Sequence, residues 1–174
     1  MNYFEFYEIP ISFKVDKAAL KKTFYINSKK YHPDFFTLES EEKQAEILEL
    51  STLNNEAYKT LNDFDKRLKY ILEIKGIMGE EGKNKLPQEF LMEMMNLNEA
   101  MMVLQFDYDE NEAQKVRGIV ESQEAEIFEE IKEIIENYNE KMTPDTELLK
   151  VKDYFLKKRY LLRILENLNT FASA

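Results

Sequence analysis

Apolar side chains recur at three- and four-residue spacing along most of the chain, which is the period of an α-helix. Near the N-terminus this spacing predicts a short aromatic helix over about residues 2–8 and a second helix with Asp16 as its N-cap. The second helix has to end at His32-Pro33, because proline lacks a backbone donor and disfavours the α region in the residue before it. Its inner face carries Leu20, Phe24, Asn27 and Tyr31.

Two more helices are predicted after the break at His32-Pro33. One covers about residues 41–62, and a shorter one covers the run DKRLKYILEI that follows it. The seam of the longer helix consists of Leu50, Leu53, Ala57 and Leu61. The N-terminal part is therefore expected to hold an antiparallel helix pair, with residues 32–34 in the loop between them.

The C-terminal part predicts three further helices, over about residues 87–105, 109–141 and 144–169. The last is expected to have Thr143 as N-cap and Pro144 as its first helical residue. The apolar stripe of the middle one consists of Val116, Val120, Ile127, Ile131, Ile134 and Tyr138. This middle helix is acidic, whereas residues 150–163 carry six Lys and Arg and one Asp. Opposite charges on neighbouring antiparallel helices suit a three-helix bundle.

The helix predicted over 87–105 is apolar nearly all round. One stripe, suited to a core, consists of Phe90, Met94, Leu97, Met101 and Leu104. Leu91, Met95 and Met102 form a second stripe, with Met92 and Val103 further round. Such a helix is either buried on all sides or offers a surface to a partner, and methionine suits an adaptable partner surface.

The run GIMGEEGKNKLP holds three of the four glycines, so residues 76–86 are the best candidate for a linker. The formal charge differs on its two sides. Residues 1–75 hold 12 basic and 13 acidic side chains, whereas residues 76–174 hold 12 and 21. This asymmetry predicts two domains, 1–75 and 87–174, with different surfaces.

The composition excludes several classes of function. There is no cysteine, which rules out disulfides, thiol nucleophiles and Cys-based metal sites in this chain. A net charge of −10 argues against a general nucleic-acid binder. No run of about 18 apolar residues predicts a membrane span, and the start MNYFEFYEIP does not resemble a signal peptide, so a cytoplasmic protein without membrane contact is expected.

The tripeptide His32-Pro33-Asp34 contains the only histidine of the chain. One histidine without cysteine cannot build the usual zinc site, and no nucleophile elbow or phosphate-binding loop occurs, so neither a catalytic nor a metal role is predicted. The plain alternatives are a surface loop or a buried ring. Pro33 stiffens the loop, and Asp34 can accept hydrogen bonds from an arginine of a partner.

Lysines lie on the helix that precedes this tripeptide, with Lys22 and Lys29 opposite its inner face and Lys21 and Lys30 flanking them. Such a face is commonly only solvated, but beside the tripeptide it could steer an acidic partner. The tripeptide, the run LNNEAYKTL and the run KRLKY together resemble a J-domain over residues 1–75. The triplet NDF at 62–64 departs from the Asp-Pro of many J-domains, which changes only a turn.

The resemblance to a J-domain implies docking on the ATPase domain of a DnaK-type chaperone. The chaperone-binding residues that it implies are His32, Pro33, Asp34, Lys21, Lys22, Lys29 and Lys30. Over nearly the whole chain the sequence resembles the HscB family of iron–sulfur co-chaperones, through the runs RLKYILEIKG, FLMEMMNLNEAM and KDYFLKKRYL. That family implies an all-α, L-shaped fold in which a J-domain is followed by a C-terminal three-helix bundle.

The HscB resemblance also implies a partner for the tail, the iron–sulfur scaffold protein IscU. The scaffold-binding residues that it implies are Leu91, Met92, Met95, Asn96, Glu99, Val103 and Phe155. The expected function is a co-chaperone that is no enzyme and needs no cofactor, and that brings IscU to an HscA- or DnaK-type ATPase.

Two alternatives to that function remain. Asn96 and Val103 stand where related proteins often have acidic residues, so the tail of a J-domain co-chaperone of a general DnaK-type chaperone could bind a different client or regulator. A helical hydrolase that uses the Glu-rich helices is the other, but no carboxylates at metal-ligand spacing support it.

Overall fold

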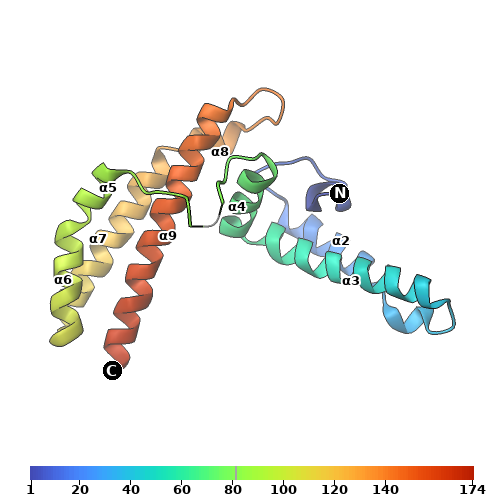
Figure 1. Ribbon diagram of the computed structural model, residues 1–174, viewed down its shortest axis with the longest axis horizontal. Helices are drawn as coiled ribbons and strands as arrows, with labels where there is room; N and C mark the ends of the chain where they lie inside the picture. The colour runs from blue at the N-terminus through green and yellow to red at the C-terminus, as the bar shows by residue number, and fades with distance from the viewer. Residues whose placement is uncertain (81) are drawn as a thin grey trace. The chain divides into compact units, whose positions relative to one another are not determined.

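The computed structural model describes residues 1–80 and 82–174, and within this range all regular structure is helical. The prediction of an all-α protein is therefore confirmed. The helices form two compact units (Figure 1): unit 1 comprises residues 1–75 and 138–142, and unit 2 comprises residues 76–137 and 143–174. Residue 81, in the predicted linker 76–86, lies outside the described residues.

The helices of unit 1 follow the local signals in the sequence. They are α1 (Tyr3–Phe6), α2 (Lys17–Lys30), the 3-10 segment η1 (Pro33–Phe36), α3 (Glu41–Asn62) and α4 (Phe64–Ile74). The predicted N-cap of α2 is confirmed, because the Asp16 carboxylate accepts hydrogen bonds from the N–H groups of Ala18 and Ala19 at 2.9 and 3.0 Å. The helix ends just before His32-Pro33, as the proline requires.

The turn between α3 and α4 contains the triplet NDF. Asp63 accepts a hydrogen bond from the N–H of Lys66 at 2.9 Å and so serves as the N-cap of α4. The departure from Asp-Pro at this place therefore starts the same helix with a different cap.

The packing of α2 on α3 centres on a buried amide. Asn54 is 1% exposed, and its Nδ2 donates to the carbonyl oxygen of Phe24 at 3.1 Å and to Ser28 Oγ at 3.2 Å. Its Oδ1 accepts from the Tyr7 hydroxyl at 2.9 Å. Burial raises the pKa of Tyr7 well above its ordinary value, so the phenol remains a donor at any physiological pH. One side chain thus joins α3 to α2 and to the end of α1.

The seam predicted for α3 was half right. Ala57 and Leu61 are buried, but Leu50 and Leu53 are only half-buried. Ile47 and Asn54 take the remaining inner positions, because a polar residue can face a core when its hydrogen bonds are satisfied there.

A buried arginine links three segments of unit 1. Arg67 on α4 donates from Nε to the carbonyl oxygen of Phe13 at 2.8 Å and from Nη1 to that of Leu61 at 2.5 Å. It therefore satisfies a carbonyl at the end of α3 and one in the loop before α2. Burial lowers the pKa of this guanidinium from its ordinary value.

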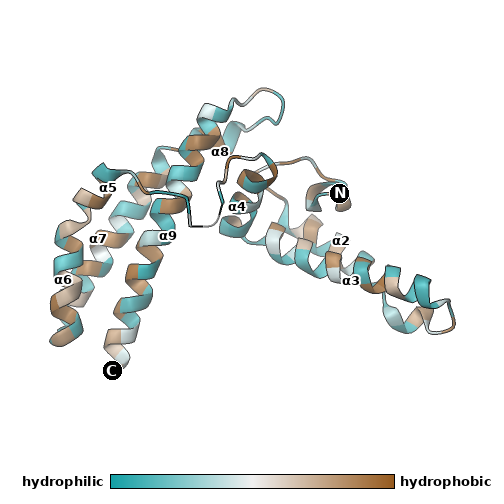
Figure 2. Ribbon diagram, in the orientation of Figure 1, coloured by the Kyte–Doolittle hydropathy of each residue, from teal (hydrophilic) through white to brown (hydrophobic). Residues whose placement is uncertain are grey.

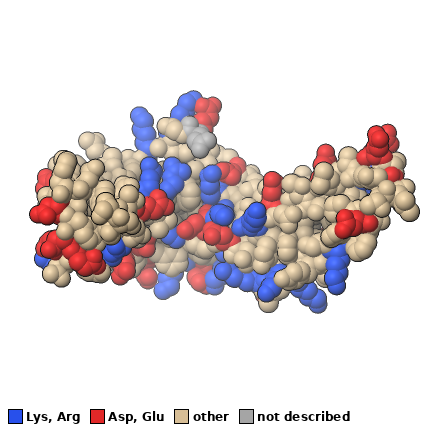
Figure 3. All heavy atoms as spheres, turned by 90° about the horizontal axis from the view of Figure 1, so that it is seen from below, with Lys and Arg blue, Asp and Glu red and all other residues tan. Residues whose placement is uncertain are grey.

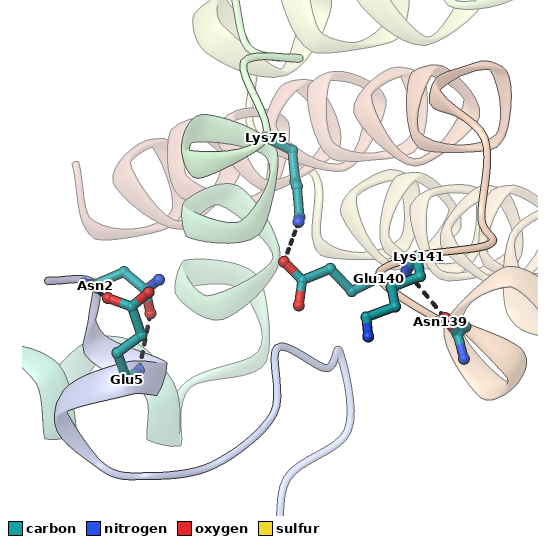
Figure 4. A network of polar contacts seen from close by, with 6 residues as sticks. All are labelled: Asn2, Glu5, Lys75, Asn139, Glu140 and Lys141. Atoms are coloured by element: carbon teal, nitrogen blue, oxygen red, sulfur yellow. Dashed lines mark hydrogen bonds and ion pairs between the residues drawn. The ribbon is translucent and has the colours of Figure 1, made fainter.

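Residues 138–142 belong to unit 1, although the sequence predicted a helix that runs to residue 141. The ring of Tyr138 meets that of Phe13 edge-on, with 4.9 Å between centroids. Lys75 Nζ lies 2.5 Å from Glu140 Oε1 (Figure 4). The helix ends at Asn137, and Asn139 turns the chain by accepting a hydrogen bond from the N–H of Lys141 at 3.0 Å.

Unit 2 is a bundle in which α7 packs on α9 and α6 packs on both. Its helices are α5 (Gln88–Glu93), α6 (Met95–Phe106), α7 (Glu110–Glu129), α8 (Lys132–Asn137) and α9 (Asp145–Ser173). The helix predicted over 87–105 is thus divided at Met94, where ψ is −3°, and the one predicted over 109–141 is divided at Glu130.

The second break moves the apolar stripe by one residue. The predicted core positions Val116, Val120, Ile127 and Ile131 are buried, but Ile135 takes the place expected for Ile134.

The predicted cap of the last helix was also wrong. Pro144 occupies the N-cap position itself, and no side chain caps α9, because an extended proline has no donor or side-chain acceptor to offer.

We expect Asn54→Ala to lower the free energy of unfolding of unit 1 by about 2–3 kcal/mol, because the substitution removes the three hydrogen bonds that the buried amide makes with the Tyr7 hydroxyl, the Phe24 carbonyl and Ser28 Oγ. Urea unfolding followed by circular dichroism measures this change. Asn55→Ala is the matched control, since its side chain is exposed on the same helix and should change stability by less than about 0.5 kcal/mol. Equal losses for the two variants would contradict the role given to Asn54.

Candidate functional site

The loop of His32, Pro33 and Asp34 is held by its own histidine. His32 is extended (φ −76°, ψ 119°), and its Nδ1 accepts a hydrogen bond from the N–H of Asp34 at 3.3 Å. Its carbonyl oxygen accepts from the N–H of Phe35 at 3.1 Å. Pro33 begins the 3-10 turn with its φ already fixed. The ring therefore caps η1, which leaves Nε2 as the donor available to a partner.

All three side chains of this tripeptide are exposed, which excludes the buried ring considered above. Asp34 Oδ2 lies 3.8 Å from His32 Nδ1, so its carboxylate is free to accept further hydrogen bonds. In the part of the chain that the structure describes, no three His, Cys, Asp or Glu side chains are arranged to hold a metal ion. The loop offers a donor and a carboxylate in fixed geometry, which suits recognition of another protein.

The four predicted lysines are exposed on α2. They are Lys21, Lys22, Lys29 and Lys30. Figure 3 shows basic side chains gathered along one edge of unit 1. Lys29 and Lys30 occupy the last turn of the helix, where positive charge is favourable, and the chain reaches His32 two residues later. We call the four lysines together with residues 32–34 the basic loop face.

Helices α5 and α6 carry two stripes, as the sequence predicted. Phe90, Met94, Leu97, Met101 and Leu104 are all buried in unit 2. Leu91, Met92, Met95, Asn96, Glu99 and Val103 are all exposed. We call this exposed set the methionine patch. Phe155, the seventh residue expected there, is only 9% exposed, and the guanidinium of Arg159 lies over its ring at 5.7 Å. It therefore contributes little free surface.

Two apolar side chains that were not among the predicted scaffold-binding residues extend the methionine patch. Met102 and Phe106 follow Met95 by seven and eleven residues, which places them on the same side of α6, and Phe106 is 88% exposed. Figure 2 shows how apolar residues continue to the end of this helix. The helical spacing was visible in the sequence, but Phe106 falls one residue beyond the predicted end of the helix.

The C-terminal part of the chain matches a family model described as the HSCB C-terminal oligomerisation domain, over residues 86–169. A co-chaperone protein HscB homolog from Vibrio cholerae is 37% identical over 102 residues, which is 58% of this chain and 60% of that protein. The chain is thus similar to co-chaperones of the HscB family. A second HscB homolog, from Psychromonas ingrahamii, is 27% identical over 147 residues, or 84% of this chain and 86% of the relative.

Two solved structures have the same fold. Human co-chaperone HscB has a TM-score of 0.77 and 27% identity, with 98% of this chain and 81% of the human chain covered. The chaperone HscB from Vibrio cholerae has a TM-score of 0.73 at 24% identity and covers 99% of this chain and 98% of its own. Within the described residues no helix is both long and apolar enough to cross a membrane.

Substitutions in the buried and the exposed stripe of α5 and α6 should affect stability differently. We expect Met94→Ala to lower the free energy of unfolding by about 2–5 kcal/mol, because Met94 is buried and its removal leaves a cavity. The same exchange at the neighbouring Met95, which is 57% exposed, should change it by less than about 0.5 kcal/mol. Thermal unfolding of both variants measures the difference, and similar melting temperatures would refute the assignment of the stripes.

Proposed function

We propose that this chain is a co-chaperone without enzymatic activity of its own. In this proposal the domain at residues 1–75 stimulates the ATPase of an HscA- or DnaK-type chaperone in the cytoplasm. The domain at residues 87–174 brings an IscU-like iron–sulfur scaffold to that chaperone and so assists the transfer of clusters to acceptor proteins. The observation that carries the proposal is the exposed, histidine-capped loop directly after a helix that exposes Lys21, Lys22, Lys29 and Lys30.

The basic loop face supplies two kinds of contact. The lysines of α2 steer the chain toward an acidic surface, an effect that weakens with salt. Once docked, Asp34 accepts charge-assisted hydrogen bonds from an arginine of the chaperone, and His32 donates from Nε2. Pro33 keeps both side chains in place, so little conformational entropy is lost on docking. The ATP is hydrolysed by the chaperone.

The methionine patch supplies a contact of different chemistry. Its exposed apolar side chains can bury surface against a scaffold protein, and the flexible thioethers adapt to the shape they meet. Because one chain then holds both partners, the scaffold meets the chaperone at a high effective concentration. Coupling of this kind needs no chemical step in the co-chaperone.

The uncharged residues Asn96 and Val103 favour a second candidate. A scaffold that presents basic side chains would find only Glu99 as a carboxylate among the seven residues assigned to scaffold binding. The tail would then bind a different client or regulator, while the basic loop face would serve a general DnaK-type chaperone.

We expect His32→Gln to abolish stimulation of the chaperone's ATPase. The helical content should stay unchanged, because the ring is exposed and packs in no core. Steady-state ATP turnover of the chaperone, measured over a range of co-chaperone concentrations, tests this. Asn55→Ala should stimulate like the unaltered chain. Full stimulation by His32→Gln would contradict the assignment of this loop to chaperone stimulation.

We expect the triple exchange Leu91→Ala, Met92→Ala and Met95→Ala to weaken scaffold binding at least tenfold, because it removes exposed apolar contact area. Calorimetry with an IscU-like scaffold gives the affinity, and ATPase stimulation in the absence of scaffold should not change. Phe155 is left in place, since its burial would confuse loss of contact with loss of stability. The matched control replaces Leu149 and Leu162, which are exposed on α9. Failure of the unaltered chain to bind the scaffold would favour the second candidate.

A further inference from the structure

Several apolar side chains near the His32-Pro33-Asp34 loop are exposed to solvent. Phe35 is 72% exposed, Leu38 is 100% exposed, and Leu48 on α3 is 59% exposed. Next to Leu48 lies a cavity of about 250 Å³, lined by Pro33, Phe36, Gln44, Ala45, Ile47 and Leu48. Exposed apolar surface gathered around a hollow is typical of an interaction site, whereas single exposed residues need no explanation.

The segment that carries Leu38 is held in one conformation. Gln44 Nε2 donates to the carbonyl oxygens of Thr37 and Glu39, at 3.3 and 2.9 Å. The N–H of Glu39 donates to the carbonyl oxygen of Phe36 at 3.1 Å. These hydrogen bonds restrain the backbone around Leu38, so ordering it on binding costs little entropy.

This apolar surface is continuous with the basic loop face. The ring of Phe35 lies against that of His32, with 5.4 Å between centroids, and Pro33 itself lines the cavity. A specific protein interface buries roughly 800 Å² on each partner, far more than a tripeptide can offer. A protein that docks on His32 and Asp34 therefore also covers Phe35 and reaches the cavity beside Leu48.

We propose that Phe35, Leu38 and Leu48 form an apolar rim that receives aliphatic or aromatic side chains of the same ATPase chaperone. The inference rests on the proposed function and adds the chemistry of the partner, which carries an apolar contact next to the acidic surface that meets the lysines. The lysines set the rate of encounter, and residues 32–34 act on the ATPase. The rim sets how tightly, and to which chaperone, the chain binds.

The double variant Leu38→Gln/Leu48→Gln tests the rim. It leaves the contact of Phe35 with His32 in place, and neither leucine side chain takes part in the hydrogen bonds of the loop. The co-chaperone concentration for half-maximal ATPase stimulation should rise about tenfold, because apolar contact area is lost. The plateau at saturation should not change, since residues 32–34 are intact. Leu149→Gln/Leu162→Gln, on α9, is the matched control and should stay within about twofold of the unaltered chain.

The dependence on salt concentration distinguishes the contribution of the rim from that of the lysines. The tenfold rise should persist between about 0.05 and 0.3 M salt, whereas the effect of Lys22→Ala/Lys29→Ala should shrink, because only charge interactions are screened. Normal half-maximal stimulation by the leucine double variant would overturn the rim and leave the proposed function standing. A changed sedimentation coefficient with normal stimulation would assign the surface to a second copy of this chain and overturn it as well. An unaltered chain that stimulates no DnaK-type chaperone would overturn the proposed function itself.

Discussion

The hydrogen bonds of Asn54 set the geometry on which unit 1 depends. A buried amide that lacked any of its partners would be destabilising, so the side chain fixes the distance and register of α2 on α3. Helix α2 carries the lysines, and α3 supplies Gln44, Ala45, Ile47 and Leu48 to the wall of the apolar cavity. The position of the loop between α2 and α3 depends on that packing, and the hydrogen bond from the N–H of Asp34 to His32 Nδ1 holds the conformation of the loop.

The chain separates two kinds of surface chemistry between its units. Unit 1 presents lysines and a carboxylate beside a small apolar rim, whereas α5 and α6 of unit 2 present an apolar stripe with few charges. Charges steer an approaching partner and are weakened by salt, while apolar contacts act only at short range and are not screened. Binding to the two surfaces can therefore respond differently to the same ionic conditions.

Most helix boundaries of unit 1 could be predicted because they depend on neighbours in sequence. Asp16 caps α2, Pro33 ends it, and the segment predicted over 41–62 is α3 to the residue. The boundaries in unit 2 were less predictable. The breaks at Met94 and Glu130 carry no proline or glycine, and Pro144 proved to be a cap position instead of the first helical residue.

By itself the sequence determined the all-α class, the tripeptide at residues 32–34, the row of lysines and the two stripes of the methionine-rich helix. Each follows from composition or from spacing along one helix. Only the tertiary structure decided that Asn54 is a core residue, that Phe155 is almost covered and that Leu38 and Phe106 are open. The reason is that burial depends on which neighbouring element covers a side chain, and the spacing within one helix does not specify that element.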